Sequence, residues 1–348
     1  MTRTLLFILL LSALAVSAAA QDSTDPNVQF GLEVFTDSKV LSAEQSMSCE
    51  TCHSFDPLLG FSDGHQRQLG LQGTRDYPDG TPGLRNVMSL YGAKFSEHAP
   101  CNSDGRADGL KALVLQACTD RTTFNMPSLQ AVIDRVNAEP RYRYLGHVVS
   151  KGTGDWRAHV VTEDEVRNAL VAFIKTINYE DVPADRLVAG LETNLPQSAL
   201  DGWPIFKEHC IVCHDPKTGW ATHAFYNIGI ASRSQSNDTG RGLITGNPAD
   251  NYKFKPRTMY GIATTAPYMH DGSISPLREC VVYFAHGGRF LLDGQIKRDP
   301  NIDPLIASIS LSEKQIDNVT DFLEFGFQGT RKEFKNPHKN PVANFGGL

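Results

Sequence analysis

Two five-residue strings in this chain combine the residue types needed to bind a haem covalently. Residues 49–53 read CETCH and residues 210–214 read CIVCH. In such strings the two thiols form thioether bonds to the porphyrin, and the histidine that follows ligates the iron from one face. A redox-active C-x-x-C pair needs no histidine, and neither string has partner ligands at zinc-finger spacing. The sequence therefore predicts two haem c groups, attached through Cys49, Cys52, Cys210 and Cys213, with His53 and His214 as iron ligands.

The surroundings of the two strings repeat weakly, which predicts one domain for each haem. Gly31 and Phe35 precede the first string with the same spacing that Gly202 and Phe206 have before the second. We place the boundary within residues 182–195, which follow a helical pattern and contain a proline. The predicted division is a signal peptide over residues 1–20, an N-terminal cytochrome c-like domain over 21–185 and a C-terminal one over 186–348.

The elements that position these strings are predicted to be helices joined by long loops. Thr162 and Glu165 form a capping box ahead of an apolar stripe at helical spacing. Ser312 and Gln315 do the same near the end of the chain. The 29 glycines and 19 prolines indicate long loops between the helices. The expected fold class is mainly α: two cytochrome c-like helical domains, each around one covalent haem c.

The N-terminus has the pattern of a secretory signal peptide. Arg3 precedes an apolar run from Leu5 to Val16, and small residues follow at Ala18 to Ala20. A membrane anchor would need about 18 apolar residues, and no later segment is apolar enough to span a bilayer. We therefore expect export, most naturally to a bacterial periplasm.

Charge and the remaining cysteines narrow the function further. The chain carries 33 basic and 39 acidic side chains and no basic run, so it lacks the electrostatic footprint of a nucleic-acid-binding protein. In an oxidising compartment Cys101 and Cys118 are expected to form a disulfide around the loop between them. Cys280, on an apolar helical stretch, is expected to be buried.

Several loop strings then indicate a family. Residues 60–64 read GFSDG, residues 104–107 read DGRA and residues 266–273 read APYMHDGS. In this order, together with the two C-x-x-C-H strings, they resemble the bacterial di-haem cytochrome c peroxidase family. That family includes a branch that oxidises tryptophans in a partner protein during its maturation. The resemblance covers essentially the whole chain after the signal peptide.

The resemblance implies a division of labour between the two haems. The haem at His53 is expected to bind and cleave hydrogen peroxide, and the haem at His214 to receive electrons from a small donor such as a cytochrome c or a cupredoxin. The peroxide iron needs an open sixth position and a polar side chain that moves a proton between the peroxide oxygens. The resemblance also implies a homodimer and a calcium ion between the domains, although the usual calcium-binding side chain aligns near Gly80.

The sequence departs from the family around the peroxide iron. Leu71 stands where many members have a removable histidine ligand, which implies a permanently open site. The distal Gln and Glu of the family align near Leu113 and Asn125, and only Asn125 keeps a hydrogen-bonding side chain. Ser103 takes the place of the tryptophan between the haems.

Residues that could replace the missing acid and base lie in a segment before Asp104 that aligns as an insertion. Glu97 and His98 lie there and are the predicted acid/base pair, with Asn125 as a further catalytic candidate. The alternative is that Glu97 and His98 are solvated loop residues.

The second iron also lacks an obvious sixth ligand. The position at which the family supplies methionine or tyrosine falls on Phe284, which cannot ligate iron. Tyr283, one residue earlier, is the predicted ligand, although adjacent helical residues point about 100° apart. His286 and Met269 are nearby alternatives, and core packing of Tyr283 is a third.

Two classes of function follow. The first is an oxidoreductase that uses hydrogen peroxide, either reducing it to water with donor electrons or oxidising a protein side chain. The second is an electron carrier or sensor that has lost peroxide chemistry together with the usual distal residues. The family resemblance favours the enzyme, and the substitutions near the peroxide iron favour the carrier.

Overall fold

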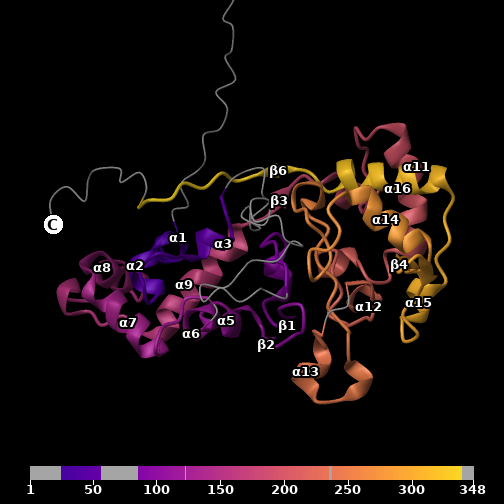
Figure 1. Cartoon of the computed structure of the whole chain (residues 1–348). Coiled ribbons are helices and arrows are strands. Elements are labelled where there is room, and N and C mark those ends of the chain that lie inside the picture. Colours follow the sequence, from indigo (N-terminus) through magenta and orange to yellow (C-terminus); the bar gives the residue numbers. More distant parts are fainter. Residues whose placement is uncertain (1–24, 56–84, 122, 235–236, 339–348) are drawn as a thin grey trace, which may run out of the picture.

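The computed structural model describes residues 25–55, 85–121, 123–234 and 237–338 (Figure 1). The predicted signal peptide, the GFSDG string, Leu71 and Gly80 lie outside the described residues. The elements of the first half are α1 (Pro26–Thr36), α2 (Ser38–Leu41), α3 (Cys49–Cys52), η1 (Ala93–Ser96), β1 (Pro100–Cys101), β2 (Ala107–Asp108), α5 (Leu110–Leu113), α6 (Gln116–Thr119), α7 (Leu129–Ala138), α8 (Pro140–Val149), η2 (Trp156–Ala158), α9 (Glu163–Thr176), β3 (Tyr179–Glu180) and α10 (Pro183–Val188).

The second half is also built from helices and short strands. Its elements are α11 (Gln197–His209), η3 (Pro216–Thr218), α12 (Ile230–Ser234), α13 (Arg241–Thr245), η4 (Pro248–Asp250), η5 (Ile262–Thr264), α14 (Leu277–Ala285), β4 (Phe290–Leu292), β5 (Gln295–Lys297), α15 (Pro304–Ala307), α16 (Glu313–Gly326) and β6 (Thr330–Arg331). In the described residues β1 pairs with β2, β3 with β6 and β4 with β5, each antiparallel. The predicted mainly helical fold is confirmed.

The two longest capped helices begin where the sequence predicts. The side chain of Thr162 accepts a hydrogen bond from the backbone N–H of Glu165, and the Glu165 carboxylate accepts one from the Thr162 N–H in return. Ser312 and Gln315 form the same capping box at the start of α16. Each box satisfies N–H groups that the first helical turn leaves without a partner. The apolar stripes behind the boxes face the core.

Each half is organised around two helices that cross at a glycine. A Cβ atom added to Gly31 on α1 would lie 2.0 Å from the backbone carbonyl oxygen of Ala169 on α9. A Cβ atom added to Gly202 on α11 would lie 2.1 Å from the carbonyl oxygen of Asn318 on α16. Only a residue without a side chain allows the backbones to approach this closely. The weak sequence repeat therefore corresponds to a repeated helix crossing.

A ring pair follows each glycine by one helical turn. The rings of Phe35 and Phe173 lie 5.1 Å apart, and those of Phe206 and Phe322 lie 5.2 Å apart, both in tilted or edge-on arrangements. Figure 1 shows the crossing pair α1 and α9 on one side of the molecule and the crossing pair α11 and α16 on the other. The domain boundary at residues 185 and 186 stays a prediction.

The end of the described chain returns from the second half to the first. We call residues 330–338 the C-terminal strap, the yellow segment that runs toward α1 in Figure 1. Its β6 pairs with β3, the ring of Phe334 lies 5.2 Å from that of Phe173, and Asn336 donates a hydrogen bond to Glu50. The strap therefore contacts the turn that carries the first haem string.

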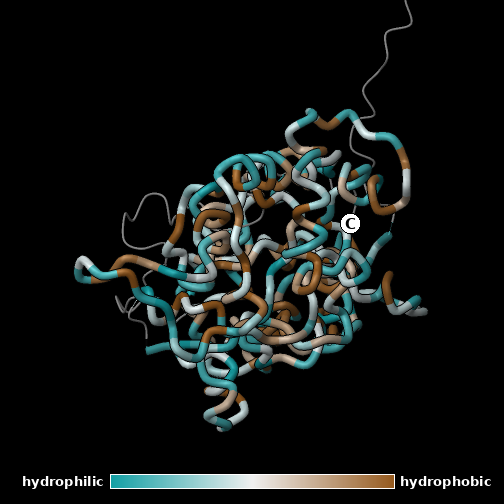
Figure 2. Tube along the Cα trace, turned by 90° about the vertical axis from the view of Figure 1, so that its right-hand side faces the viewer, coloured by the Kyte–Doolittle hydropathy of each residue, from teal (hydrophilic) through white to brown (hydrophobic). Residues whose placement is uncertain are grey.

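Hydrophilic and hydrophobic residues alternate over short stretches of the trace (Figure 2). Among the helices that the structure describes, none combines the length and the apolar character needed to cross a bilayer.

Candidate haem sites

The first string forms a single helical turn. Cys49 and Cys52 begin and end α3, and Ser48 caps the turn in a box with Thr51. His53 follows as the C-terminal cap, and its backbone N–H donates to the Cys49 carbonyl at 2.8 Å. Residues three apart on a helix lie on the same face, so the turn presents both thiols together with the imidazole next to them.

Aromatic side chains surround this turn. The ring of Phe35 lies 6.4 Å from the His53 imidazole, and Phe55 stacks on Phe35 with ring centroids 5.9 Å apart. Phe173 and Phe334 complete the cluster. A flat apolar macrocycle fits beside such a wall, because aromatic faces bury large apolar area.

The second string also forms a turn, at the end of α11. The backbone N–H groups of Cys213 and His214 both donate to the Cys210 carbonyl, at 3.1 and 3.0 Å. Burial raises the pKa of Cys210 to about 12 and that of Cys213 to about 11. At pH 7 both side chains are therefore thiols rather than thiolates.

The His214 imidazole is held by the backbone of Trp220 and of Arg257. Its Nδ1 lies 3.0 Å from the backbone carbonyl oxygen of Trp220 and must donate the hydrogen, because a carbonyl only accepts. Burial lowers the pKa of His214 to about 4, so the ring is neutral at pH 7. In that tautomer Nε2 carries a lone pair, which is the form in which histidine binds a metal.

Buried polar atoms without partners lie in the APYMHDGS string. Both ring nitrogens of His270, one carboxylate oxygen of Asp271 and the hydroxyl of Ser273 have no hydrogen-bond partner. The His270 ring stacks on Phe254 with centroids 3.8 Å apart, and burial lowers its pKa to about 4. Buried polar groups are nearly always paired, so this region lacks a polar component. The propionate groups of a haem are of the right chemistry to supply it.

The three predicted catalytic residues lie at or near the surface. The Glu97 carboxylate pairs with Lys175 at 2.5 Å, and this hydrogen bond lowers the pKa of Glu97. Glu97 and the exposed His98 line a shallow hollow of about 320 Å³. Asn125 is exposed in a turn, with a left-handed φ of 51°. Their catalytic roles stay predictions.

Tyr283, the predicted ligand of the second iron, is buried and hydrogen-bonded. Its hydroxyl donates to the backbone carbonyl of Ile228 at 2.6 Å, and burial raises its pKa. The phenol therefore keeps its proton in this arrangement, and ligation would require it to leave Ile228. Met269 packs against the same apolar cluster, while His286 is exposed. The choice among these ligands stays a prediction.

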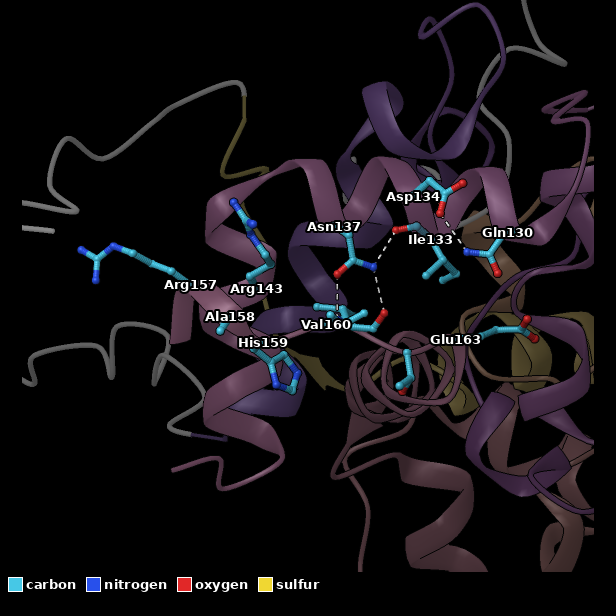
Figure 3. A pocket seen from close by; sticks show the side chains of 12 residues that line it. Gln130, Ile133, Asp134, Asn137, Arg143, Arg157, Ala158, His159, Val160 and Glu163 are labelled. Carbon is cyan, nitrogen blue, oxygen red and sulfur yellow. Dashed lines mark hydrogen bonds between the residues drawn. The ribbon is translucent and has the colours of Figure 1, made fainter. Parts of the chain in front are cut away.

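A further hollow on the first half is lined by no residue of either haem string (Figure 3). Its volume is about 510 Å³, and it lies between α7, α8 and the segment that leads into α9. Asn137 braces it: the amide nitrogen donates to the carbonyls of Ile133 and Val161 at 2.9 Å, and the amide oxygen accepts from the Val161 N–H at 2.8 Å. None of the predicted site residues lines this hollow.

The expected disulfide between Cys101 and Cys118 is wrong, because the two residues are separate buried thiols. The Cys101 thiol is turned toward the carbonyls of Ser96 and Ala99, at 3.4 Å from each. Burial raises the pKa of the Cys49 thiol, and the neighbouring Cys118 thiol raises it further. The prediction that Cys280 is buried is confirmed.

The residues described include no group of three or more His, Cys, Asp or Glu that could hold a metal ion, so calcium stays a prediction.

Sequence reasoning missed Trp220 as the acceptor for His214 and the C-terminal strap as a partner of the first turn. The acceptor is a backbone carbonyl, which any residue supplies, so no residue type marks it. The strap contacts depend on residues more than 250 positions apart in the chain, such as Glu50 and Asn336.

The fold and the two C-x-x-C-H turns, one in each half, define a di-haem c-type architecture. The solved structure of a MauG-like protein associated with microbial copper homeostasis superposes with a TM-score of 0.71 at 21% identity, covering 87% of this chain and 89% of that one. The di-haem peroxidase BthA from Burkholderia thailandensis superposes with a TM-score of 0.66 at 18% identity, covering 87% and 86%.

Sequence comparison then gives the family. The family model described as di-haem cytochrome c peroxidase matches residues 25–193. Methylamine utilization protein MauG of Paracoccus denitrificans is 26% identical and covers 91% of this chain and 92% of its own length. Cytochrome c551 peroxidase of Nitrosomonas europaea is 26% identical, with 94% and 87% covered. Cytochrome-c peroxidase IdrP2 of Denitromonas iodatirespirans is 27% identical, with 75% and 74% covered. Residues 25–193 of this chain thus match the di-haem cytochrome c peroxidase family, and the chain is a homologue of cytochrome c peroxidases and MauG, which are di-haem oxidoreductases.

Proposed function

We propose that this protein is a periplasmic di-haem c-type oxidoreductase that reduces hydrogen peroxide with electrons from a small redox protein. The observation that carries the proposal is the pair of histidine-ended turns, one in each half of a peroxidase-family fold. Cys49, Cys52, Cys210 and Cys213 would hold the porphyrins, and His53 and His214 would ligate the irons. When bound, the haems supply one-electron redox chemistry and peroxide activation.

The proposal assigns electron entry to the second haem and peroxide to the first. Val212, between the two cysteines of the second string, is 45% exposed, so a small donor protein can approach this turn. The equivalent stretch of the first string is half-buried, and Asn336 of the strap holds its Glu50. A turn open to the surface suits exchange with another protein, and a covered one suits a small substrate.

Proton transfer at the peroxide side is assigned to Glu97 and His98, with Asn125 as a hydrogen-bonding group. Cleavage of peroxide needs a group that takes a proton from one oxygen and returns it to the other. Glu97 is ionised beside Lys175 and can accept a proton. Because Glu97 is already paired and His98 is exposed, both would act from the rim of the site.

Rapid mixing of the purified di-haem protein with hydrogen peroxide tests the function. A spectral change of the haems within milliseconds, followed by steady turnover with a reduced small cytochrome c, is expected. A His53→Met variant should lose the peroxide-dependent change, whereas a His214→Met variant should lose donor oxidation. Unchanged spectra at millimolar peroxide would leave the electron carrier or sensor as the function.

Peroxide-dependent oxidation of a side chain in a partner protein is the second candidate. Leu71, at the position of the removable histidine, favours it, because the resemblance links a permanently open iron with the tryptophan-oxidising branch. A long-lived oxidised spectrum after peroxide, without turnover of the small donor, distinguishes this candidate from the peroxidase.

A further inference from the structure

Trp220 is held at its indole end by a carboxylate that belongs to neither haem string. The indole Nε1 donates to Oδ1 of Asp185 at 2.7 Å, and the Tyr260 hydroxyl donates to Oδ2 of the same carboxylate at 3.0 Å. The Trp220 side chain is completely buried. Asp185 lies on α10, the short helix that precedes the second half. Both oxygens of this half-buried carboxylate therefore have a donor.

The other end of Trp220 carries the His214 contact. Its backbone carbonyl accepts the hydrogen bond from Nδ1 of His214 at 3.0 Å. A continuous path of hydrogen bonds and covalent bonds thus runs from Asp185, through the indole and backbone of Trp220, to the imidazole. Because His214 is followed by only five residues before Trp220, a small rotation of Trp220 changes the direction of its carbonyl relative to the ring.

The backbone at Trp220 needs such an anchor. Its φ is 61°, in the left-handed region, which is unfavourable for a residue with a side chain. Gly219 before it also has a left-handed φ, and a Cβ atom added there would lie 2.2 Å from the ring of Phe95 on η1. The Thr258 hydroxyl donates to the Gly219 carbonyl at 2.9 Å. The turn is therefore fixed from three directions. Asp185 is the hydrogen-bond acceptor of the Trp220 indole, whose ring also packs against Trp203, Phe206 and Phe327.

We propose that Asp185 is a positioning residue for the iron ligand His214 and acts through Trp220. The carboxylate fixes the indole, the indole fixes the carbonyl, and the carbonyl fixes the plane of the imidazole and the proton on Nδ1. An acceptor on Nδ1 makes the histidine a stronger donor to the metal and so favours the ferric state. The inference rests on the proposed attachment of a haem at His214, but on neither peroxide chemistry nor the electron donor.

Two variants of the full-length protein test this. Asp185→Ala removes both acceptors, whereas Asp185→Asn keeps the size of the side chain and one acceptor oxygen for the indole, so it should have the smaller effect. Mass spectrometry first establishes that each variant carries two haems. Low-temperature EPR then reports the orientation of the axial ligands, and a redox titration gives the potential of each haem. We expect altered or broadened EPR signals for the second haem and a rise of its potential equivalent to about a tenfold shift of the ferric/ferrous ratio, or about 59 mV.

The route through Trp220 is tested by a double-mutant cycle. Trp220→Phe removes the indole N–H, so adding Asp185→Ala to it should cause no further shift of the second haem. Asp181→Asn is the matched control. Asp181 lies four residues before Asp185 and pairs with Arg186 at the surface, so its substitution should change neither haem.

Unchanged EPR signals and potential in Asp185→Ala, with both haems attached, would overturn the proposal. If Asp185→Ala does not fold, Trp220→Phe decides in the same way, because it removes the same hydrogen bond. Additive shifts in the double variant would also overturn it, because Asp185 would then act by another route. Loss of the second haem mass from the unmodified protein would instead contradict the proposed haem attachment.

Discussion

Arg85 and Asp238 form a two-point ion pair between parts of the chain that are 153 residues apart. Nε of Arg85 donates to Oδ2 of Asp238 at 2.5 Å, and Nη2 donates to Oδ1 at 2.8 Å. The remaining Nη1 donates to Asp104 at 2.6 Å. Asp104 begins the DGRA string of the first half and Asp238 lies in the second, so this one guanidinium joins the two halves.

Replacing Arg85 should be strongly destabilising. Arg85→Gln leaves the carboxylates of Asp104 and Asp238 buried without their shared cation, and breaking a buried pair costs about 3–5 kcal/mol. Denaturant unfolding of the two proteins at pH 7 measures the difference. Arg278→Gln is the control, because Arg278 also contacts two carboxylates but is 46% exposed, and such a loss should stay within about 1 kcal/mol. Equal effects of the two substitutions would contradict the prediction.

The same network predicts how stability responds to acid. Burial alone would raise the pKa values of Asp104 and Asp238, but the hydrogen bonds and charge of Arg85, with Arg106 at Asp104, hold both below their ordinary values. The unfolded carboxylates have pKa values of about 3.9, so below that pH the unfolded chain binds more protons than the folded one. The contribution is therefore complete above about pH 4 and is lost as the pH falls through the lowered folded values.

Unfolding free energies measured from pH 6 down to pH 3 check this response. The wild-type protein should lose more stability over this range than Arg85→Gln, whose carboxylates no longer have a lowered pKa. Parallel curves would show that the pair does not titrate as its geometry predicts.

The helix crossings predict that two glycine substitutions are costly. In Gly202→Ala the added methyl group would meet the Asn318 carbonyl, and in Gly31→Ala it would meet the Ala169 carbonyl. Each helix pair must separate, and overpacking of this kind costs about 1–3 kcal/mol or more. Asp201→Ala, on the exposed face next to Gly202, should have little effect. Thermal unfolding of the three variants measures the order, and tolerance of Gly202→Ala would mean that the helices do not touch there.

The C-terminal strap should stabilise the first half. Phe334→Ala removes a ring that contacts Phe55 and Phe173, at 5.9 and 5.2 Å between centroids, and should cost about 2 kcal/mol. Lys335→Ala, at the exposed neighbouring position, is the matched control. Denaturant unfolding followed by the haem absorption measures both. If Phe334→Ala unfolds at the same denaturant concentration as Lys335→Ala, the strap does not support this half.

Tyr283 can be tested as an iron ligand by removing only its hydroxyl. If Tyr283 ligates the second iron, Tyr283→Phe converts a six-coordinate spectrum to a five-coordinate one and raises the haem potential, because a phenolate stabilises ferric iron. Phe284→Tyr serves as the comparison, since it adds a hydroxyl one residue away. An unchanged spectrum in Tyr283→Phe would leave the hydroxyl with the Ile228 hydrogen bond that the structure shows and direct attention to Met269.

The sequence by itself determined the chemistry and the local structure. The two C-x-x-C-H strings predict haem attachment because thiols and imidazole must follow one another in a single turn, and both strings do form turns. The capping boxes at Thr162 and Ser312 start their helices through contacts three residues apart, so the pattern is visible locally. Family membership followed from the order of such short strings.

Only the tertiary structure decided how these pieces are held together. Trp220 supports His214 with a backbone carbonyl, which no residue type announces, and Asp185 reaches it from 35 positions away. The Cys101–Cys118 prediction failed because spacing in the chain does not fix where two thiols point. Arg85, Asp238 and the strap act between residues far apart in sequence, and such contacts exist only once the two halves have packed.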